Sequence, residues 1–296
     1  LDAPLVLDQG VDLKKWKPEN YGKKFYGPST LRVGLEKSRN LMTVRIAQNL
    51  GVDKVVKFSK ELKIYDDPEE LLSISLGSAE TTLLSLTSAY SSFVNGGKLI
   101  NPIIIDRIQD SEGNTIINNE NRKCMNCDKI SYTGKDYPQI KDNHAQVMSE
   151  QTAYQVTTIL EGVIKRGTGK KLRDLQLNLA GKTGTTNENT DAWFIGFTSN
   201  LVVGVYVGMD NPKPLGKFET GSKAALPIFR EFIEKSVKKS DAKPFKVPDK
   251  MTLMVVDPLT GEKAKFNSKN TIIEAYKNRN VLNGKVLYSD NNRLDT

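Results

Sequence analysis

Apolar residues recur at helical spacing along residues 28–51, with one interruption. The pattern stops at the tripeptide Ser38-Arg39-Asn40 and restarts behind it on one face, at Leu41, Val44, Ala47 and Leu50. Ser29 and Asn40 are residue types that cap helix N-termini, and Gly51 is typical of a helix end. We therefore expect two helices that meet at the tripeptide, where side chains can leave the helix and face a cleft.

Further helices and a hairpin follow along the chain. Residues 68–94 favour a helix that ends at Asn95-Gly96-Gly97. Residues 98–117 alternate around a D-S-E-G-N turn, which is typical of a β-hairpin, and residues 118–148 are polar and irregular. Residues 149–166 predict a helix capped by Ser149, with an apolar stripe at Ala153, Val156, Ile159, Leu160 and Val163.

Three consecutive strands are predicted at 177–186, 191–198 and 201–210, with a T-S-N turn between the last two. The second and third carry aromatic and β-branched residues on successive positions, as an internal antiparallel hairpin does. An amphipathic helix over 225–239 closes the pattern. Helices before and after an antiparallel hairpin predict an α+β fold, in which helices cover both faces of an antiparallel β-sheet.

The pattern divides the chain near residue 240. Residues 241–250 resemble a linker, and residues 251–266 fit a small strand-turn-strand unit. We therefore expect a main domain over residues 1–240, followed by a linker and a small β appendage over residues 241–296.

Composition is ordinary for a soluble globular protein, with 38% hydrophobic and 26% charged residues among 296. No apolar run reaches the roughly 18 residues of a membrane helix. The chain begins LDAPLVLDQG, without an initiator methionine and as though within a domain, so we expect a fragment of something longer. The 43 Lys+Arg exceed the 35 Asp+Glu by 8. The basic residues are scattered and no nucleic-acid-binding signature occurs, so we expect no nucleic-acid partner.

Cys124 and Cys127 are the only cysteines, and His144 is the only histidine. A zinc site needs two further ligands beyond the cysteines, which one histidine cannot supply. The flanking sequence resembles a loop, whereas a redox CxxC usually opens a helix. A local disulfide is favoured, with a structural pair of thiols as the alternative. No metal or organic cofactor is implied.

The stretch LAGKTGTT places Lys182 between two glycines. Glycines weaken a strand, but they suit one whose backbone is closely approached, for example by an extended peptide pairing with its edge. The lysine would then offer a cation in a cleft, beside the hydroxyls of neighbouring threonines, and would recognise the carboxylate end of a peptide. The alternative is an exposed lysine in a hairpin. A phosphate-binding P-loop is excluded, because its first glycine would fall at Gln176.

K-T-G occurs together with S-x-N and S-x-x-K in active-site serine enzymes that attack penicillin and D-alanyl peptides. The S-x-N matches at Ser268 and Ser289 follow the lysine strand and are set aside, whereas the one at Ser38 precedes it at a helix junction. The S-x-x-K match at Ser236 follows K-T-G at a polar helix end. We interpret it as a chance match and expect the nucleophile to lie outside this chain.

Four longer blocks carry a family resemblance. They are WKPENYGKKFYGPSTLRVGLEKSRNLMTVRIAQNLG, LGSAETTLLSLTSAYSSFVNGGKLINP, the stretch from QTAYQVTT to MDNPKPLG, and GSKAALPIFREFI. They span most of residues 1–235 and resemble class A penicillin-binding proteins, the bifunctional peptidoglycan synthases, in the region after the nucleophile. The resemblance implies the penicillin-binding and serine β-lactamase-like transpeptidase fold, truncated at its N-terminus.

The resemblance also implies D,D-transpeptidase activity. In the family, a serine attacks the D-Ala-D-Ala carbonyl and expels D-alanine, and an amine of a second stem peptide resolves the acyl-enzyme; β-lactams acylate the same enzyme. By position in the motifs, Ser38 is expected to relay protons and Asn40 to hold the substrate amide. Lys182 is expected to position Ser38 and to add positive potential near the substrate carboxylate.

The rest of the lysine strand matches the family's substrate-binding positions. Thr183 and Gly184 complete the motif, and a glycine at position 184 is expected to let the acyl-enzyme lie against the strand. Thr185 is expected to give a backbone N–H to the oxyanion hole, and the hydroxyls of Thr185 and Thr186 are expected to contact the substrate carboxylate.

The family context implies a larger parent protein. Without the nucleophile, we expect the fragment neither to react with penicillin nor to cross-link peptides. We expect the glycosyltransferase domain and N-terminal membrane helix of class A proteins to belong to the parent and not to this fragment. We expect the parent in the bacterial inner membrane, with this domain in the periplasm or extracytoplasmic space and with peptidoglycan stem peptides and β-lactams as partners.

Three alternatives stay open. One is a monofunctional D,D-carboxypeptidase or β-lactamase relative, although those proteins lack the WKPEN and LRVGLEKSRN blocks. Another is a penicillin-recognising sensor domain without turnover. In the third, Ser38 and Lys182 are unrelated surface residues that lie far apart. The enzyme interpretation predicts instead that the Ser38 hydroxyl and the Lys182 ammonium face one cleft within a few ångströms.

Overall fold

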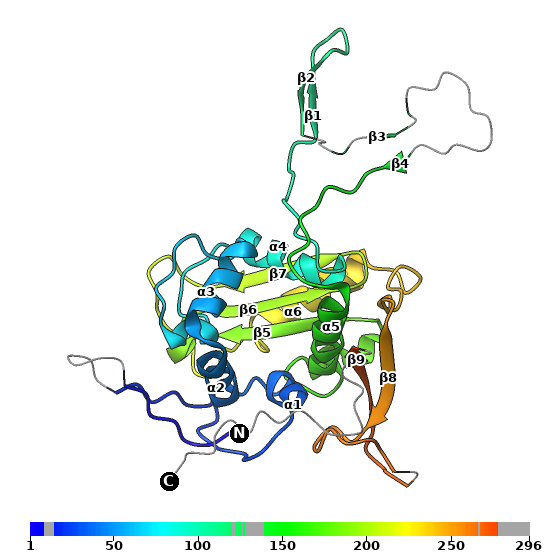
Figure 1. Cartoon of the computed structure of the whole chain (residues 1–296). Coiled ribbons are helices and arrows are strands. Elements are labelled where there is room, and N and C mark those ends of the chain that lie inside the picture. The colour runs from blue at the N-terminus through cyan, green and yellow to red at the C-terminus, as the bar shows by residue number, and fades with distance from the viewer. Residues whose placement is uncertain are drawn as a thin grey trace.

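The computed structural model describes residues 1–8, 15–119, 122, 124–125, 127, 139–265 and 267–277. At its centre is a three-stranded antiparallel sheet in the order β5 (Ala180–Thr185), β6 (Ala192–Phe197) and β7 (Val202–Val207) (Figure 1). Lys182 pairs with Ile195, which pairs with Gly204, so these residues share one face of the sheet. The predicted strands and their antiparallel arrangement are confirmed.

Helices and short hairpins make up the other regular elements. In chain order the helices are α1 (Leu31–Glu36), α2 (Asn40–Leu50), α3 (Val52–Glu61), α4 (Leu83–Val94), α5 (Glu150–Lys165) and α6 (Ala225–Ser236), with short 3-10 helices η1 (Leu72–Leu76), η2 (Lys170–Leu175) and η3 (Asn187–Asn189). The hairpins pair β1 (Arg107–Gln109) with β2 (Thr115–Asn118), β3 (Cys124–Met125) with β4 (Gln139–Ile140), and β8 (Met251–Val256) with β9 (Ile272–Lys277).

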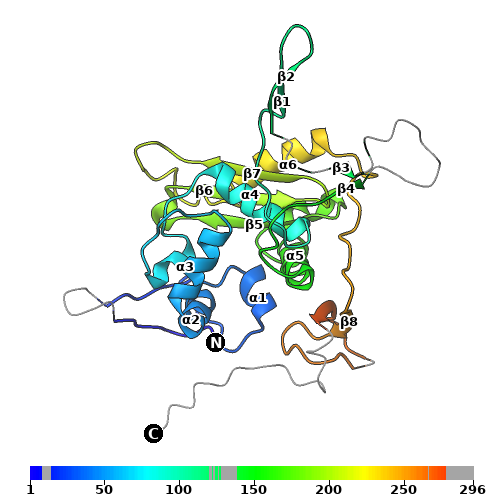
Figure 2. The same ribbon diagram turned by 45° about the horizontal axis from the view of Figure 1, so that its top comes forward.

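Helices cover both faces of the sheet, as predicted (Figure 2). The alternation along β6 sends its two buried phenylalanines to opposite sides. The Phe194 ring packs edge-on against Phe229 of α6, with 4.7 Å between centroids. Phe197 faces Tyr90 of α4 at 6.5 Å. Burial of each phenylalanine side chain stabilises the fold by about 2–3 kcal/mol.

The face that carries Lys182 is the one against α4 and α5. Gly204 lies so close to α4 that a Cβ there would fall 2.1 Å from the Thr87 hydroxyl oxygen. On α5, Leu160 and Val163 pack against Phe197, which confirms the predicted apolar stripe at these positions. Ser149 accepts a hydrogen bond from the Thr152 N–H and caps α5, as predicted. In both views α1 and α2 lie on the β5 side of the sheet (Figures 1 and 2).

The helix junction at residues 38–40 is confirmed, but its caps differ from the prediction. Thr30, not Ser29, caps α1, because its side chain accepts from the Val33 N–H. Arg39 holds the N-cap position of α2 without a side-chain bond, so Asn40 is the first helical residue rather than the cap. The predicted apolar positions of α2 are buried at Leu41, Val44 and Ala47, and the helix ends at Gly51, as expected. Leu50 is 53% exposed, because it lies at the last residue of the helix, beyond the core.

The prediction of one helix over residues 68–94 is wrong. The segment forms η1 and, after a break, α4. Gly77 ends η1 in the left-handed conformation, with φ at 85°. Thr82 then starts α4 by accepting from the Ser85 N–H. A glycine stop followed five residues later by a threonine cap therefore separates the two elements.

Between α4 and α5 the chain leaves the body, and the β1–β2 hairpin projects from it (Figure 1). The predicted hairpin is present as β1 and β2, and its turn is set by Asp110, whose carboxylate accepts from the Glu112 and Asn114 N–H groups. The stretch predicted as irregular also contains the β3–β4 pair, and much of it lies outside the described residues. Cys124 and Cys127 form a disulfide, which confirms the favoured alternative.

The C-terminal hairpin packs against α1 and α5. Gln155 of α5 donates to the Ala275 carbonyl of β9 at 2.9 Å. The predicted strand-turn-strand over 251–266 is only partly correct, since the main partner of β8 is β9, at residues 272–277, and residue 263 forms one isolated bridge. The division of the chain at residue 240 stays a prediction. Within the described residues, no helix is long and apolar enough to cross a membrane.

Candidate active site

The Ser38 and Lys182 side chains meet, although 144 positions separate them in the chain. Lys182 Nζ donates to Ser38 Oγ at 2.7 Å and to the Thr183 carbonyl at 2.8 Å. The two residues lie where the helix junction faces β5. This geometry contradicts the interpretation that they are unrelated surface residues, while their catalytic roles stay predictions.

The turn after α1 places the Ser38 hydroxyl. The Arg39 N–H donates to the Gly34 carbonyl at 2.9 Å, and the Ser38 N–H donates to the Leu35 carbonyl at 3.1 Å. These bonds form a Schellman motif with Ser38 at the C′ position, where glycine is usual. Ser38 has a φ of 54°, in the left-handed region. A serine in this conformation carries a backbone strain of about 1 kcal/mol, which a glycine would avoid. The serine, however, supplies a hydroxyl that glycine lacks.

Burial lowers the pKa of Lys182 to about 8. The residue as a whole is only half-buried, but its ammonium is enclosed by protein and loses hydration there. The two hydrogen bonds to neutral oxygens only partly replace that hydration. At neutral pH the group therefore still carries its proton, and it can release the proton far more readily than an exposed lysine.

The outer edge of β5 has no partner strand among the described residues. The Thr183 carbonyl accepts from the Lys182 ammonium, and we infer from this contact that it points to this edge. Backbone groups of every second strand residue point the same way, so the Thr185 N–H and carbonyl belong to the same edge. An extended peptide can pair with this part of the strand.

The glycines around Lys182 are explained by packing within the sheet. A Cβ at Gly181 would lie 2.7 Å from the Ile195 carbonyl oxygen. A Cβ at Gly184 would lie 3.0 Å from Trp193 Cβ. Close approach of β6, rather than of a bound peptide, therefore accounts for both glycines. Space for a substrate at Gly184 stays a prediction.

The three threonine hydroxyls of the strand already have protein partners. Thr183 Oγ1 lies 2.8 Å from Thr168 Oγ1. Thr185 Oγ1 accepts from the Gly221 N–H at 3.0 Å and keeps its own proton for donation. Thr186 Oγ1 accepts from the Asp191 N–H at 2.8 Å, just beyond the end of β5. Thr185 is therefore the hydroxyl best placed to reach a ligand at the strand edge.

The Asn40 and Arg39 side chains bond to residues outside the Ser38–Lys182 pair. Asn40 Nδ2 donates to the Glu19 carbonyl at 2.9 Å, and its Oδ1 is available as an acceptor. The Arg39 guanidinium donates to Ser29 Oγ, lies 3.7 Å from the fully buried Asp2 carboxylate, and stacks over the Tyr26 ring. Arg39 occupies the variable middle position of S-x-N, for which the motif predicts no role. No sequence signal links it to residue 2, because that contact depends on the tertiary fold.

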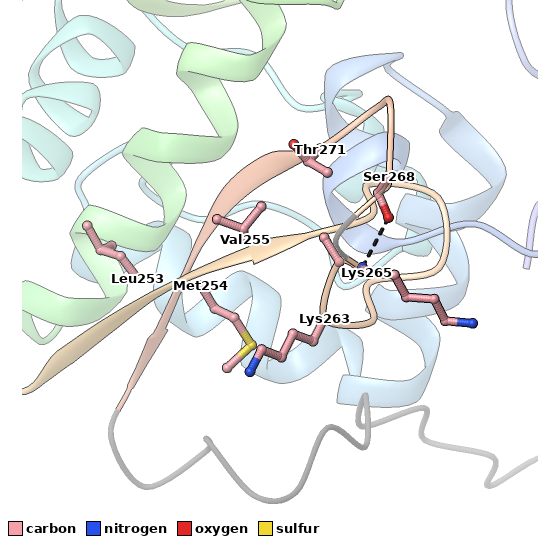
Figure 3. Close-up of a pocket in the computed structure, with 8 residues that line it drawn as sticks. Leu253, Met254, Val255, Lys263, Lys265, Ser268 and Thr271 are labelled. Carbon is pink, nitrogen blue, oxygen red and sulfur yellow. Dashed lines mark hydrogen bonds between the residues drawn. The ribbon is translucent and has the colours of Figure 1, made fainter.

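The set-aside motif matches lie elsewhere. Ser236 is the exposed last residue of α6, and Ser268 lies in the connection between β8 and β9. The match at Ser289 is outside the described residues. A hollow remote from Lys182 in the chain is lined by residues of β8 and of the connection between β8 and β9, among them Val255, Lys263 and Lys265 (Figure 3). Ser268 also lines this hollow, and its hydroxyl oxygen accepts from the Lys265 N–H at 3.0 Å.

Comparisons with known proteins identify the family of the domain. Residues 2–234 match the penicillin binding protein transpeptidase domain. Over 95% of its length, the chain is 43% identical to penicillin-binding protein 1A of Rickettsia conorii, of which it spans 35%. Among solved structures, it is similar to penicillin-binding protein 1A of Haemophilus influenzae, with a TM-score of 0.77, 28% identity, and coverage of 93% of this chain and 44% of that one. The PonA1 protein of Mycobacterium tuberculosis in complex with penicillin V shares the fold, with a TM-score of 0.64, 20% identity, and coverage of 83% and 64%.

Proposed function

The chain belongs to the penicillin-binding protein transpeptidase family, and from this membership we propose that it is the D,D-transpeptidase domain of a bifunctional peptidoglycan synthase. The observation that carries the proposal is the 2.7 Å hydrogen bond from Lys182 Nζ to Ser38 Oγ, which joins the K-T-G strand to the S-x-N turn. Relatives named penicillin-binding protein 1A support this choice within the family.

Ser38 and Lys182 handle protons in the proposed reaction. A serine hydroxyl of the parent attacks the D-Ala-D-Ala carbonyl and gives its proton to an adjacent base, the lysine of the parent's S-x-x-K. The C–O ester bond forms as the peptide C–N bond breaks, the base returns its proton to the Ser38–Lys182 pair, and the D-alanine amine takes up a proton. Ser38 can deliver that proton because its oxygen accepts from Lys182 while its own hydrogen is free to donate. With a pKa of about 8, Lys182 can replace the proton near neutral pH. An acceptor amine then displaces the ester oxygen and closes the cross-link.

The substrate is proposed to lie along the outer edge of β5. The Thr185 N–H faces that edge and would stabilise the oxyanion, while the Thr185 hydroxyl and the Lys182 charge would attract the terminal carboxylate. β-Lactams present a similar carbonyl and carboxylate, and the PonA1 protein, which shares this fold, is known in complex with penicillin V. Peptidoglycan stem peptides and β-lactams are therefore the proposed ligands.

The proposed nucleophile belongs to a segment outside this sequence. The S-x-x-K matches at Ser236 and Ser240 both follow the lysine strand in the chain. Ser236 lies on an exposed helix end, far along the chain from the Ser38 turn. We propose that the full-length parent supplies the serine, a glycosyltransferase domain and a membrane anchor, and that this domain faces the periplasm or extracytoplasmic space.

Labelling with a fluorescent penicillin tests the proposed function. The 296-residue chain should stay unlabelled, and the full-length parent should be labelled covalently on a serine upstream of residue 1. A Ser236→Ala variant of the parent should be labelled like the wild type. Labelling of the short chain at Ser236 would overturn the assignment of the nucleophile, and a full-length parent that resists labelling would overturn the proposed activity.

A further inference from the structure

A buried carboxylate lies two residues before Ser38 and takes no part in the proposed reaction. Glu36, the last residue of α1, is 2% exposed. Its two oxygens accept from the Arg166 guanidinium, at 3.1 Å from Nε and 2.5 Å from Nη2. Gly162 of α5 makes room for it, since a Cβ there would fall 1.8 Å from Glu36 Oε1. A buried charge needs such pairing, so this arrangement fixes the end of α1 on α5.

The turn over residues 166–169 contacts both halves of the site. The Thr168 N–H donates to the Glu36 carbonyl at 3.2 Å. Its hydroxyl lies 2.8 Å from the hydroxyl of Thr183, the residue next to Lys182. Gly167 allows the turn to come this close, because a Cβ there would fall 2.2 Å from the Glu36 carbonyl oxygen. One residue therefore joins the segment that leads to Ser38 with the strand that carries Lys182.

We propose that Thr168, anchored by the Glu36–Arg166 ion pair, is a positioning residue that sets the separation between the Ser38 hydroxyl and the Lys182 ammonium. The proposal rests on the function proposed above for that pair. Thr168 touches neither group directly. It acts by holding the α1 end and β5 at a fixed spacing, which the 2.7 Å contact between Lys182 Nζ and Ser38 Oγ requires.

Titration of Lys182 reports this spacing without any nucleophile or substrate. In the 296-residue chain with 13C-labelled lysine, the Lys182 signal is identified by its loss in Lys182→Arg and should titrate with a pKa of about 8. In Thr168→Val, which keeps the N–H but lacks the hydroxyl, β5 can move away from α1 and admit water. The pKa should then rise toward 10.5, the ordinary value for lysine. Thr168→Ser restores the hydroxyl and should titrate like the wild type.

A threonine on α5 provides the matched control. Thr157 is buried, and its hydroxyl donates to the Phe93 carbonyl at 3.2 Å, away from both segments. Thr157→Val should lower stability while the pKa of Lys182 stays near 8. A folded Thr168→Val protein with an unchanged Lys182 pKa would overturn the proposal, and so would an equal shift in Thr157→Val.

A second variant covers the case in which Thr168→Val does not fold. The double variant Glu36→Gln, Arg166→Gln removes both charges, so neither is left buried alone. This double variant should also raise the pKa of Lys182, as Thr168→Val does. An unchanged pKa would overturn the proposal. Penicillin labelling of the full-length parent is a separate measurement. If the wild-type parent is labelled but the pKa of Lys182 does not shift in Thr168→Val, only the positioning role is overturned. An unlabelled wild type defeats the proposed function alone.

Discussion

Arg32 on α1 and Glu274 on β9 form a bidentate ion pair, although 242 positions separate them in the chain. The Arg32 Nε donates to Glu274 Oε2 at 2.5 Å, and Nη2 donates to Oε1. The same guanidinium donates to the Thr158 carbonyl of α5 at 2.8 Å. The C-terminal hairpin is thereby attached to the helix that ends at the Ser38 turn.

Removing one partner of this pair should destabilise the chain. Arg32 is 4% exposed, so Glu274→Gln leaves a buried guanidinium without the carboxylate that neutralises most of its charge. We expect a loss of roughly 2–3 kcal/mol in the free energy of unfolding, measured in urea. Glu231→Gln on the exposed surface of α6, which breaks the pair with Lys235, serves as the control and should leave stability almost unchanged. Equal effects of the two variants would show that the hairpin is not held by Arg32.

Substitutions at Ser38 separate its backbone strain from its hydroxyl. Glycine adopts the left-handed conformation without strain, whereas alanine keeps the Cβ and loses only the hydroxyl. Ser38→Gly should therefore be more stable than Ser38→Ala by about 1 kcal/mol, measured by denaturant unfolding. An alanine variant as stable as the glycine variant would contradict the Schellman geometry.

Stability should depend on pH through Lys182. Its pKa of about 8 in the folded chain lies below the ordinary value of 10.5, so the unfolded chain binds more protons between these values. The folded state therefore gains stability as pH rises from 8 to 10.5, and this contribution is absent below pH 8. The difference in unfolding free energy between wild type and Lys182→Met should change in favour of the wild type across that range. A flat difference would mean that the ammonium is fully hydrated.

Gly162 should not tolerate a side chain. Because a Cβ at this position would lie 1.8 Å from Glu36 Oε1, Gly162→Ala must push the buried carboxylate away from Arg166. We expect a destabilisation of about 3 kcal/mol in urea unfolding. Gly22→Ala is the control, since nothing lies within 4 Å of a Cβ there. If both alanine variants unfold alike, Glu36 does not occupy the space beside α5.

The sequence was most informative where local pattern and fold agree. Aromatic and β-branched residues around 192–207 predicted the strands that the structure contains, and Ser149 marked the start of α5. The Ser38 turn was located, but its left-handed backbone was not foreseen, because serine is uncommon at that helix end. The break at Gly77 was missed because the leucine-rich pattern continues across it.

Contacts made by charged side chains could not be predicted. Glu36 and Arg32 have the spacing of an exposed helical pair, yet both are buried by partners on α5 and β9 that are far away in the sequence. Arg39 likewise depends on Asp2 and Tyr26. The burial of such side chains depends on tertiary packing, and the periodicity of the sequence does not predict it.

The acylation rate of the full-length parent tests the central claim most directly. We would measure the second-order rate constant of covalent labelling by a fluorescent penicillin in wild type, Ser38→Gly and Lys182→Met, with folding checked by unfolding curves. If the joined hydroxyl and ammonium serve the reaction, each variant should be slower by about a hundredfold or more. Folded variants that label at the wild-type rate would contradict the claim.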